Sequence, residues 1–430
     1  MLFRQFVDED LGCASYLVGD AGEAVVVDPA FAIEQYLEAA DAEGLRIVRV
    51  LETHTHADHL SGHGRFALEH SVPVSIHRIA EPEYPFDAIA DGEVVRAGSV
   101  EIRVVHTPGH RPEHCAFVVD EKLVLTGDSL FVGEAARPDL AVEPRQGAAD
   151  LFHSLHRLAE LPEDVVVYPG HVSGSLCGTN MSAERFTSIG REKKTNVALK
   201  VDEVSFVDSS SSVGAPKPPT TEHVVALNRG PWVAARPSLK AATADGAVVL
   251  DVRPVAEFAA GHVRGAISVA LAGGSFATRA AFVLDSSEQI VIQANSAAEA
   301  QEAARRLWSV GLFGELGYLL DAAAVEATET LTVPEFGRLL EAGEIQVLDV
   351  REESERTSGV VSGAILLPYR VVGTAALDEL DPGRPVFTIC VSGARAVLAA
   401  SLLARRGYDA RPVVGGGVDD LTTQRPQLVG

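Results

Sequence analysis

The sequence contains few cysteines and few basic residues for a chain of 430 residues. Its four cysteines, Cys13, Cys115, Cys177 and Cys390, lie far apart and form no CxxC pair. Neither a disulfide framework nor a cysteine zinc site is therefore predicted. There are 36 lysines and arginines against 60 aspartates and glutamates, which gives a formal net charge of -24. Such an acidic chain repels phosphate backbones and anionic lipids, so we expect neither a nucleic acid nor a membrane among its partners.

Long apolar runs are absent as well. No stretch reaches the roughly 18 consecutive apolar residues of a membrane-spanning helix, and the N-terminal segment turns acidic before an apolar core can form. We therefore expect a cytoplasmic protein. Apolar residues still make up 47% of the chain, which is enough to fold compact domains. Because 430 residues exceed what one hydrophobic core usually serves, two or three domains are predicted.

Histidine is scarce in the C-terminal half of the chain and frequent before it. Twelve of the fourteen histidines lie within the first 171 residues. Their densest group is the segment THTHADH at residues 53–59, which directly follows an apolar, strand-like run. In extended backbone His54 and His56 point the same way and can reach one metal ion, while Asp58 and His59 can reach a second point beside it. A metal site in the N-terminal half is therefore predicted.

Three further ligand candidates follow predicted strands in the same half. His110, Asp128 and His171 each come directly after a glycine at the end of an apolar run. Glycine lets the backbone turn sharply, so loops at one edge of a packed sheet can bring these side chains to a common ion. Each of them alone has an ordinary explanation as a turn residue. Together with residues 53–59 they indicate a metal centre on a mixed α/β fold.

Residues 1–200 resemble the metallo-β-lactamase superfamily on these motifs. The resemblance implies an αβ/βα sandwich with metal bound at one end of its two sheets. Within the superfamily, the segments at 53–59, 107–110, 127–130 and 169–171 are most similar to glyoxalase II and to persulfide dioxygenases. Those two branches carry out different chemistry.

The two branches differ in how many metals they hold. For a hydrolase, the resemblance implies a binuclear site with Asp128 as the bridge and six further ligands: His54, His56 and His110 on one metal, and Asp58, His59 and His171 on the other. For a persulfide dioxygenase, it implies one Fe(II) per chain, bound by His54, His110 and Asp128 and surrounded by the other four residues. All seven residues are present, so the ligands alone leave both alternatives open.

The second half of the chain repeats itself after a Ser- and Pro-rich stretch at residues 207–220, which is predicted to be a linker or long loop. VVLDVR at 248–253 recurs as VLDVR at 347–351, and GHVRGAI at 261–267 recurs as GVVSGAI at 359–365. Each copy continues with an apolar strand, a short loop and an alanine-rich helix. This period predicts two homologous α/β domains of about a hundred residues each.

The loop of the second copy contains a candidate nucleophile. Cys390 follows a buried strand-like run and precedes a predicted helix. Backbone N–H groups at the helix N-terminus, with Arg395 nearby, should stabilise its thiolate. The whole loop consists of Cys390, Val391, Ser392, Gly393, Ala394 and Arg395. The first copy has Ala294 in place of the cysteine and lacks the glycine and arginine, so it is predicted to be catalytically silent.

With its Asp-Val-Arg and Gly-Ala motifs, the second copy is similar to rhodanese sulfurtransferases, in which the cysteine carries a sulfane sulfur as a persulfide. We expect a metallo-β-lactamase-like domain with a C-terminal linker at residues 1–236, a silent rhodanese-like domain at 237–326 and an active rhodanese domain at 327–430. This combination resembles the multidomain sulfurtransferase persulfide dioxygenases.

The resemblance implies an enzyme of sulfide detoxification. It would oxidise a low-molecular-weight thiol persulfide with O₂ to sulfite and thiol, while Cys390 exchanges sulfane sulfur with sulfite or thiosulfate in a direction that the sequence leaves open. Cys177, six residues after His171, is a candidate persulfide carrier near the metal, or a thiol packed under its loop. A homo-oligomer is expected. Two alternatives stay open: a glyoxalase II-like binuclear thioester hydrolase, and a sulfane-sulfur carrier that oxidises nothing.

Overall fold

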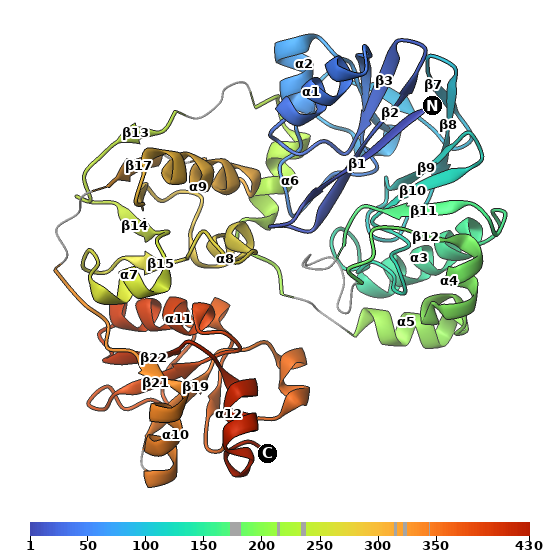
Figure 1. Ribbon diagram of the computed structural model, residues 1–430. Coiled ribbons are helices and arrows are strands. Elements are labelled where there is room, and N and C mark those ends of the chain that lie inside the picture. The colour runs from blue at the N-terminus through green and yellow to red at the C-terminus, as the bar shows by residue number, and fades with distance from the viewer. Residues whose placement is uncertain (173–181, 213–215, 234–237, 314–315, 321–324, 344) are drawn as a thin grey trace. The chain divides into compact units, whose positions relative to one another are not determined.

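The computed structural model of the chain describes residues 1–172, 182–212, 216–233, 238–313, 316–320, 325–343 and 345–430. It divides into two compact units, Met1–Arg236 with Trp308–Gly311, and Pro237–Leu307 with Leu312–Gly430 (Figure 1). Both units are mixed α/β, which confirms the predicted fold class. Within the described part of the chain, no helix combines the length and the apolar character that crossing a bilayer requires.

The first unit contains two six-stranded sheets with the strand orders β1-β2-β3-β4-β5-β6 and β12-β11-β10-β9-β8-β7. The first sheet consists of β1 (Leu2–Asp8), β2 (Cys13–Asp20), β3 (Glu23–Val27), β4 (Arg46–Leu51), β5 (Val74–His77) and β6 (Asp87–Ile89). The second consists of β7 (Val94–Ala97), β8 (Val100–His106), β9 (Cys115–Val119), β10 (Leu123–Gly127), β11 (Val166–Pro169) and β12 (Thr187–Ser188). One apolar core containing residues of both sheets lies between them.

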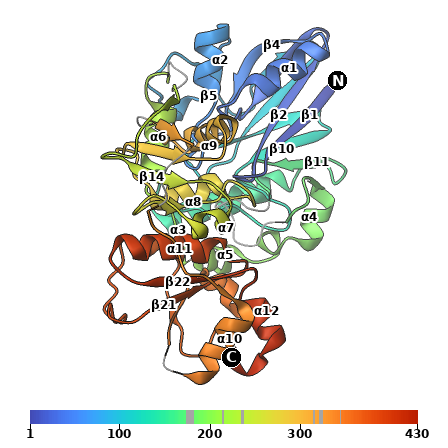
Figure 2. The ribbon, with the colours of Figure 1, turned by 60° about the vertical axis from the view of Figure 1, so that its left-hand side comes forward.

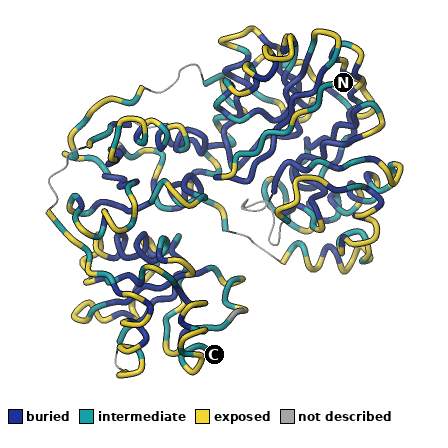
Figure 3. Tube along the Cα trace, viewed as in Figure 1, coloured by how far each residue is buried: buried dark blue, intermediate teal, exposed yellow. Residues whose placement is uncertain are grey.

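Side chains alternate along each strand between the two faces of its sheet, and this alternation creates the layers of the sandwich. In β2, Tyr16 and Val18 are buried in the core between the sheets, whereas Leu17 faces the helices on the outer side. That outer layer contains α1 (Glu34–Ala42) and α2 (His63–His70). The other sheet is covered by α3 (Pro144–Leu158), α4 (Ile189–Thr195) and α5 (Glu203–Ser211). Figure 3 shows that the inner strands are buried while the outer turns of the helices are exposed.

The predicted linker is partly helical. α5 extends to Ser211, and Val207 is buried in the core beneath the second sheet. A further helix, α6 (Thr221–Arg229), follows it. The linker prediction was therefore wrong for residues 207–211, because the serine-rich composition conceals a helix that packs against α3 through a few apolar side chains.

The second unit contains two five-stranded sheets with equivalent strand orders, β13-β17-β16-β14-β15 and β18-β22-β21-β19-β20. The first copy contains β13 (Lys240–Ala241), β14 (Val248–Asp251), β15 (Ile267–Ser268), β16 (Ile290–Gln293), β17 (Leu316–Leu319), α7 (Val255–Ala260), α8 (Phe276–Val283) and α9 (Ala297–Ser309). The second contains β18 (Leu331–Thr332), β19 (Gln346–Asp349), β20 (Ile365–Leu366), β21 (Val386–Ile389), β22 (Ala410–Val414), α10 (Val333–Ala342), α11 (Ala394–Arg405) and α12 (Val418–Gln424). The internal repeat is therefore also a repeat of topology.

A buried arginine joins the two motifs that recur in each copy, which are the Asp-Val-Arg motif and the later segment that begins with glycine. Arg351 donates from Nη2 to Asp349 Oδ2 and to Gly359 O, each at 2.7 Å. Its side chain is fully buried, where a guanidinium requires both the carboxylate and the carbonyl. Arg253 makes the same two kinds of contact in the first copy. This pairing is why Asp-Val-Arg and the later glycine recur together.

The helix α11 packs against the first copy. Val397 of α11 shares an apolar cluster with Phe258 and Ala266, and Ser401 Oγ accepts a hydrogen bond from Ser268 N at 3.2 Å. Figure 2 shows α11 beside α7 and α8. The copy without the cysteine therefore supports the helix that begins directly after the Cys390 loop.

Candidate functional site

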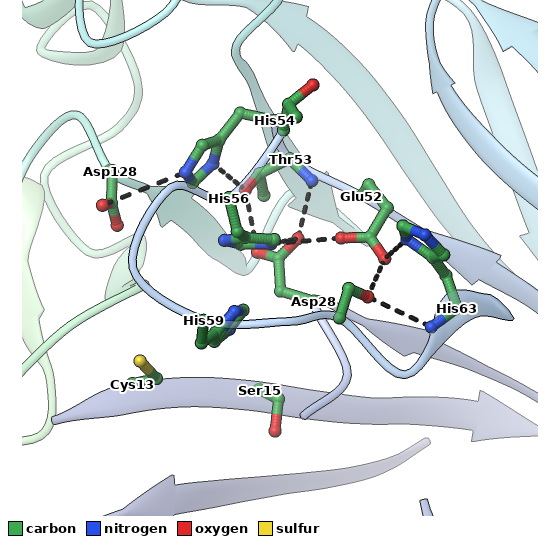
Figure 4. Close-up of polar contacts among 12 residues, drawn as sticks. Cys13, Ser15, Asp28, Glu52, Thr53, His54, His56, His59, His63 and Asp128 are labelled. Carbon is green, nitrogen blue, oxygen red and sulfur yellow. Dashed lines mark hydrogen bonds and ion pairs between the residues drawn. The ribbon is translucent and has the colours of Figure 1, made fainter. Parts of the chain in front are cut away.

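Three side chains from separate strand ends meet at one point. His54 follows β4, His110 follows β8 and Asp128 directly follows β10, and all three are buried. His110 Nε2 lies 3.4 Å from Asp128 Oδ2. His54 Nε2 lies 4.0 Å from the same oxygen, and Figure 4 shows this pair. Among the described residues, neither His54 Nε2 nor Asp128 Oδ2 has a hydrogen-bond partner. Because buried polar atoms are rarely left unpaired, this geometry fits a metal ion at their common point.

Hydrogen bonds to the far ring nitrogens set the tautomers of the two imidazoles. Thr53 Oγ1 donates to Asp28 Oδ2 at 2.8 Å, so the same oxygen accepts from His54 Nδ1 at 2.8 Å. His110 Nδ1 donates to Arg137 O at 2.9 Å. Burial lowers the pKa of both imidazoles, so each is neutral. Each ring therefore presents a lone pair on Nε2, as a metal ligand must.

Asp128 is oriented by two other histidines. His171 Nδ1 donates to Asp128 Oδ1 at 2.6 Å, and the Asp128 N–H donates to His114 Nε2 at 2.9 Å. Burial alone would raise the pKa of Asp128, but the charge of His171 and its hydrogen bond hold that pKa below its usual value. Asp128 is therefore a carboxylate whose Oδ2 faces the two Nε2 atoms. His114 was not among the predicted site residues.

His56 is held by two buried carboxylates. Its Nε2 lies 3.1 Å from Glu52 Oε2 and 3.3 Å from Asp28 Oδ1 (Figure 4). Burial opposes the charge, but these carboxylates raise the pKa of His56 to about 10. Glu52 also accepts hydrogen bonds from Ser61 Oγ at 2.6 Å and from His63 Nδ1 at 3.0 Å. Sequence reasoning missed Asp28 and Glu52, although each directly follows a strand, which is the pattern that identified Asp128.

The other predicted ligands form a second cluster, which a cysteine joins. His171 Nε2 lies 2.8 Å from Asp58 Oδ2 and 3.2 Å from Cys13 Sγ. Cys13 Sγ lies 3.5 Å from Asp58 Oδ2. Burial, reinforced by Asp58, raises the pKa of the Cys13 thiol. The imidazole of His59 lies 4.2 Å from that of His56, measured between ring centroids. All seven predicted side chains thus lie in one region, while their roles as ligands stay predictions.

A side chain of α6 holds the backbone of the histidine segment. Asn228 Nδ2 donates to His56 O at 2.9 Å and to His59 O at 2.8 Å, and its Oδ1 accepts from Ser61 N at 2.9 Å. Asn228 is buried. It follows the stretch predicted to be a linker, residues 207–220, and is more than 160 residues away from the histidine segment in sequence, so no local motif could have identified it.

Replacing Asn228 by alanine is expected to weaken metal binding about 10- to 100-fold, because partners that orient ligands affect affinity to that extent. The change leaves two buried carbonyls and one N–H without their partner, at a cost of about 1–3 kcal/mol for each group. Chelator competition on the full chain measures the affinity, and urea unfolding measures the stability. Asn295→Ala, at an exposed position, is the matched control. An affinity unchanged by Asn228→Ala would contradict the prediction.

Cys390 is buried at the end of β21, directly before the loop that leads into α11. Gly393 N donates to Cys390 Sγ at 3.1 Å. Gly393 has a φ of 97°, in the left-handed region that favours glycine, and an added Cβ would lie 3.1 Å from Val414 Cα. The Val391 and Ser392 side of the loop is exposed. The loop therefore directs an N–H group at the sulfur, as the sequence predicts.

Arg395 is bound by a carboxylate that the sequence did not reveal. Its Nη1 and Nη2 donate to Glu355 Oε2 and Oε1 at 2.5 and 2.6 Å. The guanidinium remains close enough to Cys390 to interact with it electrostatically. In the first copy, Glu299 takes the place of Arg395 and accepts from Asn295 N at 2.9 Å. The loop of the first copy thus satisfies its own N–H with a carboxylate, whose charge disfavours an anion there. The remaining candidate, Cys177, lies outside the described residues.

Family comparisons agree with this architecture. Residues 8–171 match the metallo-beta-lactamase superfamily, and residues 236–322 and 332–423 match the rhodanese-like domain. The mitochondrial persulfide dioxygenase ETHE1 of Homo sapiens is 31% identical over 242 residues, which cover 53% of this chain and 87% of that protein. The chain belongs to the metallo-β-lactamase superfamily. Its N-terminal half is homologous to persulfide dioxygenases, and the predicted fusion to rhodanese-like domains is confirmed.

The chain is also similar to two further members of the superfamily. A solved metallo-beta-lactamase from Staphylococcus aureus subsp. aureus COL has a TM-score of 0.68 and 28% identity, and the match covers 74% of this chain and 98% of that chain. The hydroxyacylglutathione hydrolase of Rhizobium johnstonii is 37% identical over 140 residues, but these cover only 31% of this chain and 52% of that protein. The similarity to the hydrolase therefore extends over about half of the hydrolase.

Proposed function

We propose that the chain is a persulfide dioxygenase joined to a rhodanese sulfurtransferase and that it acts in sulfide detoxification. Its N-terminal domain converts a low-molecular-weight thiol persulfide, O₂ and water into thiol, sulfite and two protons, with one Fe(II) per chain. The proposed domains are residues 1–236, 237–326, which is silent, and 327–430, which contains Cys390. Homology to persulfide dioxygenases over most of their length supports the assignment.

The observation that carries the proposal is the compact set of His54, His110 and Asp128. Two imidazoles and one carboxylate, with their ligand atoms within 4.8 Å of one another, form the donor set typical of mononuclear non-haem iron. Fe(II) held there would supply the redox chemistry that the reaction with O₂ requires. The protein orients the ligands, through Thr53 for His54 and through Arg137 O for His110.

His171 is suited to hold a proton next to this set. Its Nδ1 bonds to Asp128 Oδ1 and its Nε2 lies 2.8 Å from Asp58 Oδ2, so each ring nitrogen faces a carboxylate. A proton on Nδ1 keeps the negative charge of Asp128 balanced without occupying Oδ2. His171 therefore supports the mononuclear arrangement by engaging one carboxylate oxygen and leaving the other directed at the imidazoles.

The rhodanese step is proposed to pass through Cys390. Its thiolate attacks the outer sulfur of thiosulfate, the S–S bond breaks, and sulfite leaves while Cys390 becomes a persulfide; the reverse reaction makes thiosulfate from sulfite. The Gly393 N–H stabilises negative charge on the sulfur. Glu355 holds the Arg395 guanidinium in place beside the loop.

A binuclear thioester hydrolase is the second candidate. His56 Nδ1 and His59 Nδ1 are buried and have no hydrogen-bond partner among the described residues, as expected if both imidazoles bind metal. The sequence similarity to hydroxyacylglutathione hydrolase points the same way. The two candidates predict different metal contents and different reactions.

The deciding experiment combines metal analysis with oxygen uptake on the full chain. We expect one iron per chain and, with glutathione persulfide as the probe substrate, consumption of one O₂ for each sulfite formed. Hydroxyacylglutathione supplied to the same preparation is the control substrate and should not be hydrolysed. Two metal ions per chain, with thioester hydrolysis and no oxygen uptake, would overturn the proposal.

A further inference from the structure

An arginine beside the proposed iron ligands is almost fully enclosed. Arg111 directly follows His110 in the loop after β8, and its side chain retains only 8% exposure. Burying a guanidinium is costly unless its charge and its hydrogen-bond donors are matched. A buried cation at this position therefore needs partners of opposite charge.

Glu113 supplies only part of that match. Arg111 Nε donates to Glu113 Oε1 at 2.8 Å, and the same oxygen accepts from Thr55 N at 3.1 Å. Arg103 on β8, by contrast, binds Glu121 through both Nε and Nη2, each at 2.8 Å. Nη1 and Nη2 of Arg111 have no hydrogen-bond partner among the described residues. They also reach the solvent-accessible surface, since neither is one of the enclosed polar atoms that lack a partner.

The loop holds this guanidinium next to the proposed iron ligands. Thr55 directly follows His54, so the carboxylate of Glu113 ties Arg111 to the histidine segment. The charge of Arg111 also acts on the imidazoles of His54 and His110. Burial lowers the pKa of both most strongly, and the nearby guanidinium lowers it further. An anion bound by Nη1 and Nη2 therefore lies close to the metal centre.

We propose that Arg111 forms an oxyanion subsite at the edge of the metal centre through its Nη1 and Nη2 groups. This edge of a guanidinium presents two parallel N–H donors, which match two oxygens of one oxyanion. Two such groups belong to the proposed reaction, sulfite as the product and a carboxylate of the thiol that carries the persulfide, so these two sources rest on the proposed function. Because the chain has a formal net charge of -24, a local cation is also needed to attract an anion.

Anaerobic isothermal titration calorimetry on the full chain as purified measures this subsite directly. The Cys390→Ser background removes sulfur transfer, and sulfite and S-methylglutathione are titrated separately as probes for the two oxyanions. We expect Arg111→Gln to weaken binding of at least one probe about 10- to 100-fold, because hydrogen bonds to charged groups contribute that much. Weaker binding of sulfite identifies a product site, and weaker binding of S-methylglutathione identifies a carboxylate site.

Matched variants separate the loss of the donors from a loss of folding. Arg111→Gln leaves the buried Glu113 carboxylate without its cation, so the double variant with Glu113→Gln, which leaves no unpaired charge, should show the same weakening. Arg111→Lys keeps the charge but not the paired donors and should recover only part of the affinity. Arg46 pairs with Glu23 at 3.0 Å and its side chain is 74% exposed, so Arg46→Gln is the control and should bind both probes normally.

Unchanged affinity for both probes in Arg111→Gln and in the double variant overturns the proposal, as does an equal loss in Arg46→Gln. Full recovery in Arg111→Lys also overturns it, because a single charge would then suffice. The titration involves no turnover. A chain that binds an oxyanion through Arg111 but consumes no oxygen would therefore refute the proposed dioxygenase reaction and leave the subsite standing.

Discussion

Replacing His110 or Asp128 by alanine is expected to abolish both iron binding and oxygen consumption. Each change removes one of the three proposed ligands, which leaves two protein donors for the ion. Removing a partner that merely orients a ligand weakens binding about 10- to 100-fold. The loss on removing a ligand itself should exceed this. Iron content per chain and the initial rate of oxygen uptake with glutathione persulfide measure the two effects.

His56→Ala and His171→Ala are expected to weaken iron binding less, because these residues contact carboxylates around the site. Their effects should lie within the range of about 10- to 100-fold that orienting residues show. His153→Ala, at a side chain with 66% exposure, serves as the matched control and should bind iron normally. If His56 or His171 proves as indispensable for metal retention as His110, the site is binuclear and the dioxygenase proposal fails.

Replacing Cys390 by serine is expected to abolish sulfur transfer between thiosulfate and thiols while persulfide oxidation continues. A hydroxyl cannot hold a sulfane sulfur, whereas the proposed iron ligands belong to the other compact unit. After incubation with thiosulfate, mass spectrometry of the wild-type chain should show one added sulfur on the peptide that contains Cys390. The serine variant should show none.

Cys115→Ser provides the comparison for this experiment, because burial raises the pKa of its thiol and keeps it unreactive. That variant should retain both sulfur transfer and the added mass on Cys390. Labelling of Cys13 or Cys115 in the wild-type chain, without labelling of Cys390, would show that the sulfur is carried elsewhere.

Local patterns in the sequence were sufficient to predict much of this architecture. The fold class and the fusion of a metallo-β-lactamase domain with rhodanese-like domains were predicted correctly, because both depend on motifs contained in short segments. The THTHADH segment and the glycines before His110, Asp128 and His171 occupy strand ends, where parallel and antiparallel ladders bring separated loops to one edge. The repeated Asp-Val-Arg motif predicted the repeated strand order because its arginine closes a buried contact in each copy.

Other features required the tertiary structure because they join residues that no spacing relates. Sheet pairing places Cys13 against His171 across 158 positions, and helix packing places Asn228 against the histidine segment across 172. Glu355 reaches Arg395 from a short 3-10 helix (Glu353–Ser358), 40 residues earlier. In each case the partners are polar groups whose burial becomes favourable only when the fold supplies a matching donor or acceptor. The sequence alone therefore determined which chemical groups stand at the strand ends, while the folded chain decided which of them meet.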